Sequence, residues 1–369
     1  MNIQPSAIGQ LMRIGLNNEI LRECLLLTFE KTNPADSGFD PHLLRVMEVH
    51  RDSLTLHDGL SAFTARALPA LHTRLLDQAD ALAVGDWVLA RRNALGEWWA
   101  FERVPPINQL ARRLHDGRDK VERVVIVSNV NTALLVMGLD HDYNLERLER
   151  YVALVRMAGV MPVVVLTKAD LCRDPQSRLR EVRARLPAGA DAVALNALGD
   201  EAAQVLAPWL GAGQTLVLLG SSGAGKSTLT NSLNSGANTS PQDTGPNRQG
   251  DSRGRHTTTA RSLHPLPGGA CVIDTPGVRT LRLDGEAQAL DAVFDDIARL
   301  APLCRFRDCG HQNEPGCAVR EAVEPARLRN FHKLQREARR DTLTALERKA
   351  QLAVWKARSR SARQRDAAS

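Results

Sequence analysis

Residues 220–227 read Gly220-Ser221-Ser222-Gly223-Ala224-Gly225-Lys226-Ser227. This stretch fits the phosphate-loop pattern, and it lies between an apolar run at 215–219 and a helix-compatible segment at 229–233. Glycines let backbone N–H groups turn inward around phosphates, and the start of the following helix adds positive potential. The stretch therefore predicts a nucleotide site in an α/β fold, with an ordinary glycine-rich turn as the alternative.

The side chains of this loop have separate expected roles. Lys226 is expected to reach the β and γ phosphate oxygens, and Ser227 to ligate Mg²⁺. The nucleotide-binding residues predicted in this segment are Gly220, Ser221, Ser222, Gly223, Ala224, Gly225, Lys226, Ser227 and Thr228.

Two further elements follow the loop along the chain. Asp274-Thr275-Pro276-Gly277 closes an apolar strand at 271–273, which suits a carboxylate that holds Mg²⁺ and a Gly277 N–H that senses the γ-phosphate. The tetrapeptide alone is a weak signal. A polar loop from about 235 to Thr259 has the character of a switch segment that orders around a triphosphate, and Thr258 is expected to complete the magnesium shell.

The base-reading element comes before the phosphate loop. Thr167-Lys168-Ala169-Asp170 follows an apolar strand at 162–166, so Asp170 stands at the carboxyl end of a strand, where α/β proteins bind ligands. A carboxylate there accepts hydrogen bonds from N1–H and the exocyclic amine of guanine, whereas adenine presents an acceptor at N1. Asn196 and Ala197 follow the next strand and are expected to contact the guanine oxygen, with an ordinary loop as the alternative.

The order of these elements is permuted, because in an ordinary GTPase the phosphate loop comes first. Here the base-reading element leads and Asp274 comes last, so the same pocket is expected from a circularly permuted chain. The segment after Asp274 then connects directly to a cysteine and histidine cluster. We expect GTP hydrolysis to affect this C-terminal module through the connecting segment.

The cluster consists of Cys304, Cys309, His311 and Cys317. Three thiolates and one imidazole within fourteen residues form a complete tetrahedral set for one structural Zn²⁺, with no open position for chemistry. Gly310 and Gly316 supply turns that let the ligands converge. The other cysteines, Cys24, Cys172 and Cys271, are scattered and are expected to be small buried packing residues.

The composition is that of a protein with several cores. Hydrophobic residues make up 43% of 369, and the net charge is +6, with much of the excess in the last forty residues. That balance suggests a polyanionic partner such as nucleic acid, with a solvated basic face as the alternative. Residues 1–31 lack a charged-then-apolar leader, and no apolar run is long enough to cross a bilayer, so we expect a cytoplasmic protein without a membrane partner.

The sequence predicts a multidomain α/β protein. An N-terminal extension at 1–36 reads as helical or irregular and receives no function, and a basic stretch at 112–118 reads as a linker. Short alternating strands at 44–49, 54–57, 61–67, 87–90 and 97–104 predict a five-stranded oligonucleotide-binding (OB) type barrel. Its aromatic residues are expected in the core, with base stacking as the alternative. The predicted units are the barrel at 37–110, a circularly permuted phosphate-loop GTPase domain at 111–286, and a zinc-binding helical domain with a basic tail at 287–369.

Between 121 and 282, apolar runs alternate with helical stretches, the pattern of a parallel sheet covered on both faces. The strand candidates are 124–127, 133–137, 162–166, 192–195, 215–219 and 270–273, and the helix candidates are 145–158 and 201–210.

Taken together, the barrel, the three nucleotide signatures and the zinc loop, in that order, resemble the circularly permuted GTPases of the RsgA family. The resemblance covers roughly residues 40–340. It implies a late assembly factor that binds the immature small ribosomal subunit and its rRNA, uses GTP with Mg²⁺, and departs when GTP is hydrolysed to GDP. A monomer is expected.

Two positions depart from the usual pattern. Thr167 stands where an asparagine is usual, so guanine selectivity is expected to be weaker. Val278 stands where many GTPases place a glutamine that orients water, so slow hydrolysis without a partner is expected. His256 is the candidate catalytic residue that the subunit would bring toward the attacking water, and a plain loop histidine is the alternative.

Two rival functions share these residues. The chain could be an RNA-binding switch in which turnover is incidental, or an ATPase or nucleotide kinase that uses the same phosphate loop. The response of the base preference to a change at Asp170 separates a GTPase from the latter.

Overall fold

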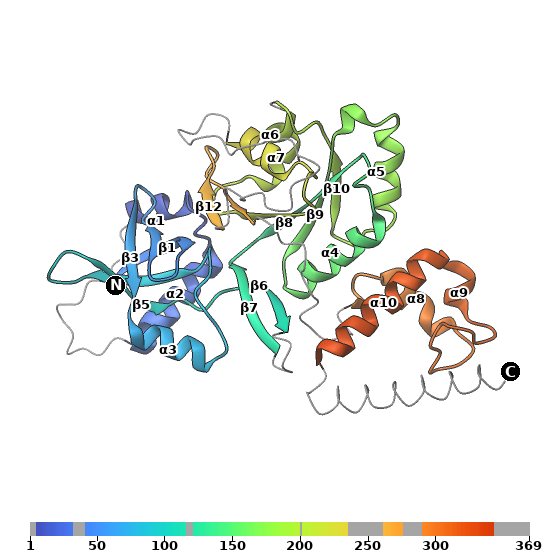
Figure 1. The fold of residues 1–369 in the computed structure, drawn as a ribbon, viewed down its shortest axis with the longest axis horizontal. Helices are drawn as coiled ribbons and strands as arrows, with labels where there is room; N and C mark the ends of the chain where they lie inside the picture. The colour runs from blue at the N-terminus through green and yellow to red at the C-terminus, as the bar shows by residue number, and fades with distance from the viewer. Residues whose placement is uncertain are drawn as a thin grey trace, which may run out of the picture.

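The computed structural model describes residues 5–31, 41–115, 121–199, 201–234, 261–275 and 290–342. Figure 1 shows three parts along the chain: a barrel with the N-terminal helices, a central sheet with helices, and a C-terminal helical lobe. Within these residues, no helix is long and apolar enough to span a membrane.

The barrel predicted from alternating strands is confirmed. Five strands close in the order β1-β2-β3-β5-β4, and only the β3–β5 pair is parallel. A helix that the sequence pattern did not predict, α3 (Pro69–Asp77), buries Leu71 and Leu75 against the barrel interior. The strands are β1 (His42–Val49), β2 (Leu54–His57), β3 (Ala62–Ala67), β4 (Trp87–Arg92) and β5 (Trp98–Arg103).

The central sheet has the order β10-β9-β8-β11-β13-β12. Its neighbours are parallel except for the edge strand β12, which pairs antiparallel with β13. Two buried clusters cover the two faces, because Leu134 and Val136 of β8 lie in one and Ala133 and Leu135 in the other. The strands are β8 (Thr132–Gly138), β9 (Met161–Thr167), β10 (Asp191–Ala194), β11 (Thr215–Leu219), β12 (Ser262–Pro265) and β13 (Cys271–Asp274).

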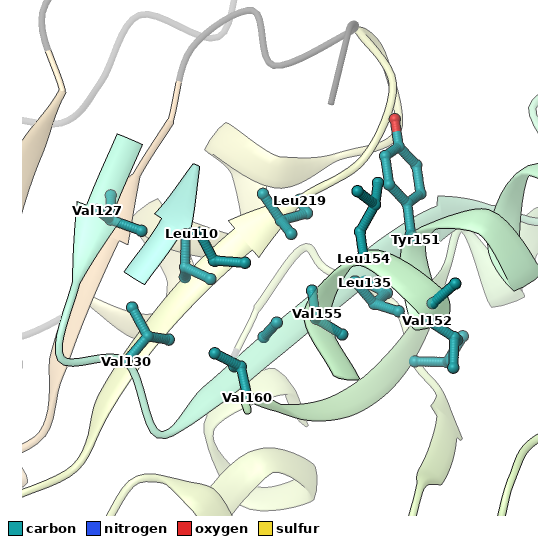
Figure 2. Packing of buried hydrophobic residues seen from close by; sticks show 14 of the residues in the cluster. Leu110, Val127, Val130, Leu135, Tyr151, Val152, Leu154, Val155, Val160 and Leu219 are labelled. Carbon is teal, nitrogen blue, oxygen red and sulfur yellow. The ribbon is translucent and has the colours of Figure 1, made fainter. Parts of the chain in front are cut away.

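In the described part of the chain, four α-helices accompany the sheet. Figure 2 shows Val152, Leu154 and Val155 of the first of them packing toward Leu135 of β8 and Leu219 of β11. The helices are α4 (Leu145–Met157), α5 (Pro175–Arg183), α6 (Glu201–Leu206) and α7 (Lys226–Leu233). The helix expected at 201–210 therefore stops at Leu206, and a 3-10 turn at Ala207–Trp209 follows it.

Two assignments between the barrel and the sheet were wrong. The stretch expected to be a linker begins inside a strand, β6 (Gln109–His115), which forms an antiparallel hairpin with β7 (Val121–Ser128). The run at 124–127, expected in the parallel sheet, therefore belongs to this separate hairpin. A short apolar run has the same sequence pattern in a parallel sheet and in a hairpin, because its side chains are buried in both. Here Leu110 of β6 and Val127 of β7 lie in the same buried cluster as the apolar side chains of α4 (Figure 2).

The N-terminal helices join the barrel to the sheet. In α1 (Pro5–Met12), α2 (Asn18–Lys31) and the turn between them, five apolar side chains enter the largest core cluster. The fully buried Arg45 of β1 donates to the Ile14 carbonyl at 2.6 Å and to the Asn129 carbonyl at 3.3 Å, so it ties the turn, the barrel and the sheet together. A Cβ at Gly15 would come within 1.9 Å of the Arg45 Nη1. The apolar side chains are Leu11, Ile14, Leu16, Ile20 and Cys24.

The C-terminal lobe contains α8 (Asp295–Leu300), α9 (Ala318–Ala322) and α10 (Pro325–Thr342), and α10 lies beside α4 (Figure 1). The buried Glu149 of α4 accepts a hydrogen bond from Arg327 at 2.7 Å and another from the Asn330 amide at 2.6 Å. Asp296 of α8 binds the same guanidinium at 2.8 Å. Because α4 packs on β8 and β9, these bonds fix the lobe to the unit that contains the central sheet.

The scattered cysteines behave largely as expected. Cys24 and Cys271 are buried, and burial raises the pKa of each thiol to about 11. Cys172 is only half-buried, contrary to expectation, since it follows an exposed 3-10 turn after β9.

Asp86, a fully buried acid of the barrel, gives a pH-dependent prediction. Burial raises the pKa of its carboxyl to about 6, against the opposing charge of Arg103, whose Nη1 lies 3.8 Å away. A raised pKa means that the folded protein binds this proton more tightly. The contribution to stability is therefore fully present below about pH 4 and is lost as pH rises through about 6. Its upper limit is about 3 kcal/mol.

In denaturant titrations from pH 4 to 8, we expect the free energy of unfolding of the wild type, minus that of Asp86→Asn, to fall as pH rises. Asp80→Asn serves as the control. Burial raises the pKa of Asp80, but the hydrogen bond and charge of Arg103, with the hydrogen bonds from the Ala81 N–H and Gln109, together lower it. A difference that does not change with pH would contradict the prediction.

Candidate nucleotide and metal sites

The nucleotide site lies where the strands of the sheet end. The phosphate loop joins β11 to α7, as predicted, and Gly225 caps the helix with φ 95°. A Cβ at Gly220 would lie 2.2 Å from the Val136 carbonyl oxygen of β8, so glycine is needed for this close approach. The loop is thus packed directly on the sheet, with its backbone leading into a helix N-terminus.

Lys226 folds back over the loop. Its Nζ donates to the Gly220 carbonyl at 2.9 Å and to the Ser221 carbonyl at 2.6 Å. Ser227 and Thr228 follow in the first turn of α7 and are half-buried. The ammonium, the helix N-terminus and these hydroxyls therefore gather at one place, a suitable environment for phosphate oxygens.

The base-reading motif contacts the phosphate loop across the permuted order. Thr167 donates its hydroxyl to the Ala224 carbonyl at 2.6 Å, and Lys168 donates to the Gly223 carbonyl at 2.8 Å. Asp170 is exposed in the 3-10 turn Ala169–Leu171, immediately after β9. The two motifs predicted to share a pocket thus lie side by side, and Thr167 makes a bond to the loop in place of the usual asparagine.

Asn196 and Ala197 lie beside this motif. The Leu195 carbonyl accepts from the Ala169 N–H at 3.3 Å, which joins the end of β10 to the turn that carries Asp170. The Asn196 side chain accepts from the Leu198 N–H at 2.9 Å, and the Ala197 carbonyl accepts from Ser232 of α7 at 2.5 Å. The segment is therefore held in a defined turn next to the base-reading residues.

Asp274 ends β13 and is 7% exposed. The next residue, Thr275, donates its hydroxyl to the Leu218 carbonyl of β11 at 2.8 Å, so the end of β13 is tied to the strand that leads into the phosphate loop. The Asp274 carboxylate and the Ser227 hydroxyl are oxygen donors of the kind that Mg²⁺ takes. The other residues predicted here, His256, Thr258 and Gly277, lie outside the described residues, as does Val278.

Two residues that contact the candidate site were not predicted, Asp140 and Asp142, in the loop between β8 and α4. Asp140 accepts a hydrogen bond from Lys168 Nζ at 2.7 Å, and Asp142 accepts one from the Ser221 hydroxyl. They follow an apolar run that ends at Met137, so the rule that locates Asp170 at a strand end also applies to them.

The four predicted zinc ligands converge. Their ligand atoms all lie within 4.8 Å of one another. The Cys304 and Cys317 sulfurs are 3.9 Å apart, and the His311 Nδ1 is 3.6 and 3.5 Å from them. Tetrahedral Zn²⁺ with ordinary bond lengths requires sulfur–sulfur edges of about 3.8 Å and sulfur–nitrogen edges of about 3.6 Å. The donor set and its spacing therefore fit zinc.

The loop that presents these ligands is organised by Glu314. Its carboxylate accepts from the N–H groups of Gly310, Gln312 and Asn313 at 2.7–2.9 Å. Hydrogen bonds from its own N–H and from these amides lower the pKa of Glu314. Since His311 has φ 56°, this carboxylate stabilises a turn that few side chains adopt.

A parallel sheet with a phosphate loop, a base-reading motif placed before that loop and a zinc-type cluster after it defines the class of circularly permuted GTPases. Comparison with known proteins is consistent with this class. The RsgA GTPase family model matches residues 105–284.

Two curated relatives carry the name Small ribosomal subunit biogenesis GTPase RsgA. The one from Mesorhizobium japonicum is 44% identical over 81% of this chain and 84% of its own length. The one from Xylella fastidiosa strain 9a5c is 43% identical over 79% and 84%. The chain therefore belongs to the RsgA family of GTPases.

Solved structures show the same fold at lower identity. The crystal structure of YjeQ from Thermotoga maritima matches with a TM-score of 0.59 at 22% identity, over 81% of this chain and 99% of that one. YloQ, described as a circularly permuted GTPase, matches with a TM-score of 0.56 at 21% identity, over 84% and 98%.

Proposed function

We propose that this GTPase acts as a late assembly factor of the small ribosomal subunit, and that the subunit stimulates hydrolysis and is released by it. The observation that carries the GTPase part is the Lys168 bond to the Gly223 carbonyl at 2.8 Å, which joins the base-reading and phosphate elements. The ribosomal part is supported by the relatives, which are named for small-subunit biogenesis.

Each predicted residue has a role in this proposal. Asp170 reads guanine, Asn196 and Ala197 contact its oxygen, and residues 220–228 with Gly277 hold the phosphates. Ser227, Thr258 and Asp274 hold Mg²⁺, which would neutralise charge on the phosphate oxygens. Cys304, Cys309, His311 and Cys317 hold one Zn²⁺, and His256 directs the attacking water.

The rRNA contact is proposed to include the barrel. Trp98 and Trp99 are half-buried, and each has a guanidinium over its ring: Arg92 at 4.9 Å and Arg66 at 5.9 Å. Phe63 stacks on Trp98, with ring centroids 4.8 Å apart. Trp98 is therefore already covered by side chains of the barrel, whereas Trp99, with one adjacent cation, suits stacking of an unpaired base, and the arginines suit contact with phosphates. We also propose that the protein is a cytoplasmic monomer.

The test is GTP hydrolysis with and without purified small subunits. Because Val278 cannot orient water, we expect slow turnover alone and roughly tenfold or greater stimulation by small subunits, with large subunits as the control. His256→Ala should reduce stimulated turnover far more than GTP affinity. No stimulation, together with subunit affinity that differs between GTP and GDP, would support the nucleotide-switched RNA-binding module instead.

A further inference from the structure

The loop between β8 and α4 contacts both halves of the nucleotide site. Asp140 uses its two carboxylate oxygens separately: Oδ2 accepts from Lys168 Nζ at 2.7 Å, and Oδ1 accepts from the Asp142 N–H at 3.1 Å. Asp142, 8% exposed, accepts from the Gly138 N–H at 3.1 Å, from Arg147 at 2.6 Å and from the Ser221 hydroxyl. The loop is therefore fixed internally and bonded outward to two nucleotide motifs.

We propose that Asp140 is a positioning residue for nucleotide binding that acts through Lys168. It holds the base-reading segment in the geometry that places Asp170 against guanine. The proposal rests on GTP binding in this pocket and is independent of any ribosomal partner.

The need for such a residue follows from the chemistry of Lys168. Lysine has a flexible four-carbon stem, so a single hydrogen bond leaves its ammonium free to move about that contact. Here two acceptors fix it, because the Asp140 carboxylate and the Gly223 carbonyl each bind the same Nζ, at 2.7 and 2.8 Å. Of the two, only the Asp140 bond pairs opposite charges, so it is the stronger.

The backbone of Lys168 adds a second constraint. Its φ is 59°, in the left-handed region, and it directly precedes the turn that carries Asp170. Fixing the Lys168 side chain therefore also restrains the start of that turn, two residues from the base-reading carboxylate. Asp140 is suited to this role at neutral pH. Burial raises its pKa, but the hydrogen bonds from Lys168 and the Asp142 N–H, together with the charges of Lys168 and His141, outweigh burial and lower the net pKa.

A purely structural role for Asp140 predicts a different outcome. If the carboxylate only supports the loop through the Asp142 N–H, its loss lowers thermal stability and leaves nucleotide affinity nearly unchanged. If it acts through Lys168, affinity falls, and the effect disappears once Lys168 has been removed.

The experiment is a double-mutant cycle between Asp140→Ala and Lys168→Ala, with dissociation constants for GTP and GDP from fluorescent-nucleotide displacement. We expect Asp140→Ala to weaken both nucleotides by the same factor, roughly tenfold, as for loss of one charge-assisted hydrogen bond. The factor is shared because Asp140 contacts Lys168 and its own loop, and neither is a γ-phosphate ligand. In steady-state hydrolysis KM should rise while kcat at saturating GTP stays unchanged.

Two further variants make the assignment specific. Asp140→Asn keeps an acceptor oxygen for the ammonium and should recover affinity to within about threefold of the wild type. Asp191→Ala is the matched control. Asp191 is an exposed acid at the amino-terminal end of β10, whereas Asp140 follows the carboxyl end of β8 in the same sheet. The control variant should leave both dissociation constants unchanged.

The proposal is overturned if adding Asp140→Ala to Lys168→Ala weakens nucleotide binding by the same factor as adding Asp140→Ala to the wild type, because the two residues then act independently. It is also overturned if Asp140→Ala binds GTP normally. The assays contain no ribosomal subunits, so failure of the ribosomal role would appear only in the stimulation experiment and not here.

Discussion

Asp170→Asn is expected to lose GTP affinity by about 100-fold or more and to prefer xanthosine triphosphate. The carboxylate accepts two hydrogen bonds from guanine, from N1–H and from the exocyclic amine. In the variant, the NH2 group of the asparagine amide would face either the N1–H or the exocyclic amine of guanine, so two hydrogen-bond donors would oppose each other. Loss of charge-assisted bonds of about 1.5–3 kcal/mol each, with one donor left unpaired, corresponds to this factor. Xanthine carries an oxygen where guanine carries the amine, so the same amide satisfies it.

The measurement is competition of GTP, ATP and xanthosine triphosphate against a fluorescent nucleotide for the wild type and the variant. Asp174→Asn, four residues along, is the control, because Asp174 caps α5 through the Ser177 N–H at 2.9 Å. We expect Asp174→Asn to keep the wild-type preference. If Asp170→Asn also keeps it, Asp170 does not read the base.

The barrel and the sheet were predictable because local patterns determine them. Alternating side chains at 54–57 and 61–67 identify β2 and β3, and the apolar run before Asp170 identifies β9. The motifs at strand ends then place the base-reading and phosphate elements at one edge, since parallel strands end together. The bond from Lys168 to Gly223 agrees with that expectation.

What could not be predicted depends on contacts between distant segments. Arg45 lies in a predicted strand, yet its complete burial follows from the Ile14 and Asn129 carbonyls and from Trp87, whose ring lies 5.2 Å from the guanidinium. The alternation of side chains along a strand does not predict that an arginine will have such partners. The hairpin of β6 and β7 was missed for a related reason, because its apolar run reads as a parallel strand until its pairing partner is known.

Asp140 and Asp142 show a third limit. Both stand at a strand end, and neither belongs to a named motif, so sequence reasoning passed over them. Their significance comes from Lys168 and Ser221, which lie 28 and 79 residues away along the chain. A search for polar residues after every predicted strand would have found them, together with many residues that bind nothing.

Removal of one zinc ligand is expected to unfold the C-terminal lobe while leaving the nucleotide site intact. Cys317→Ala removes a buried thiolate that also belongs to the hydrophobic cluster with Val319 and Phe331. Structural zinc contributes about 10 kcal/mol or more of binding free energy in small domains. The ligand loop lies between the two short helices of this lobe, α8 with 6 residues and α9 with 5, so their placement depends on the metal-held loop.

We expect Cys317→Ala to bind less than one tenth of the zinc held by the wild type, measured by plasma mass spectrometry, and to show early proteolysis within 290–342. GTP affinity should change by less than about threefold, because the lobe contacts α4 through Glu149 and supplies none of the described contacts of the phosphate loop. Chelation of the wild-type protein should reproduce both effects.

The matched control is Cys172→Ala, a half-buried cysteine outside the cluster, which should keep full zinc and the wild-type proteolysis pattern. A Cys317→Ala protein with full zinc content and a resistant lobe would contradict the assignment of the four ligands. A large loss of GTP affinity would instead mean that the folding of the lobe is coupled to α4 and to the loop before it, through the hydrogen bonds of Glu149 with Arg327 and Asn330. Adding Glu149→Gln to each protein separates these cases, since coupling through that contact requires the two changes to be non-additive.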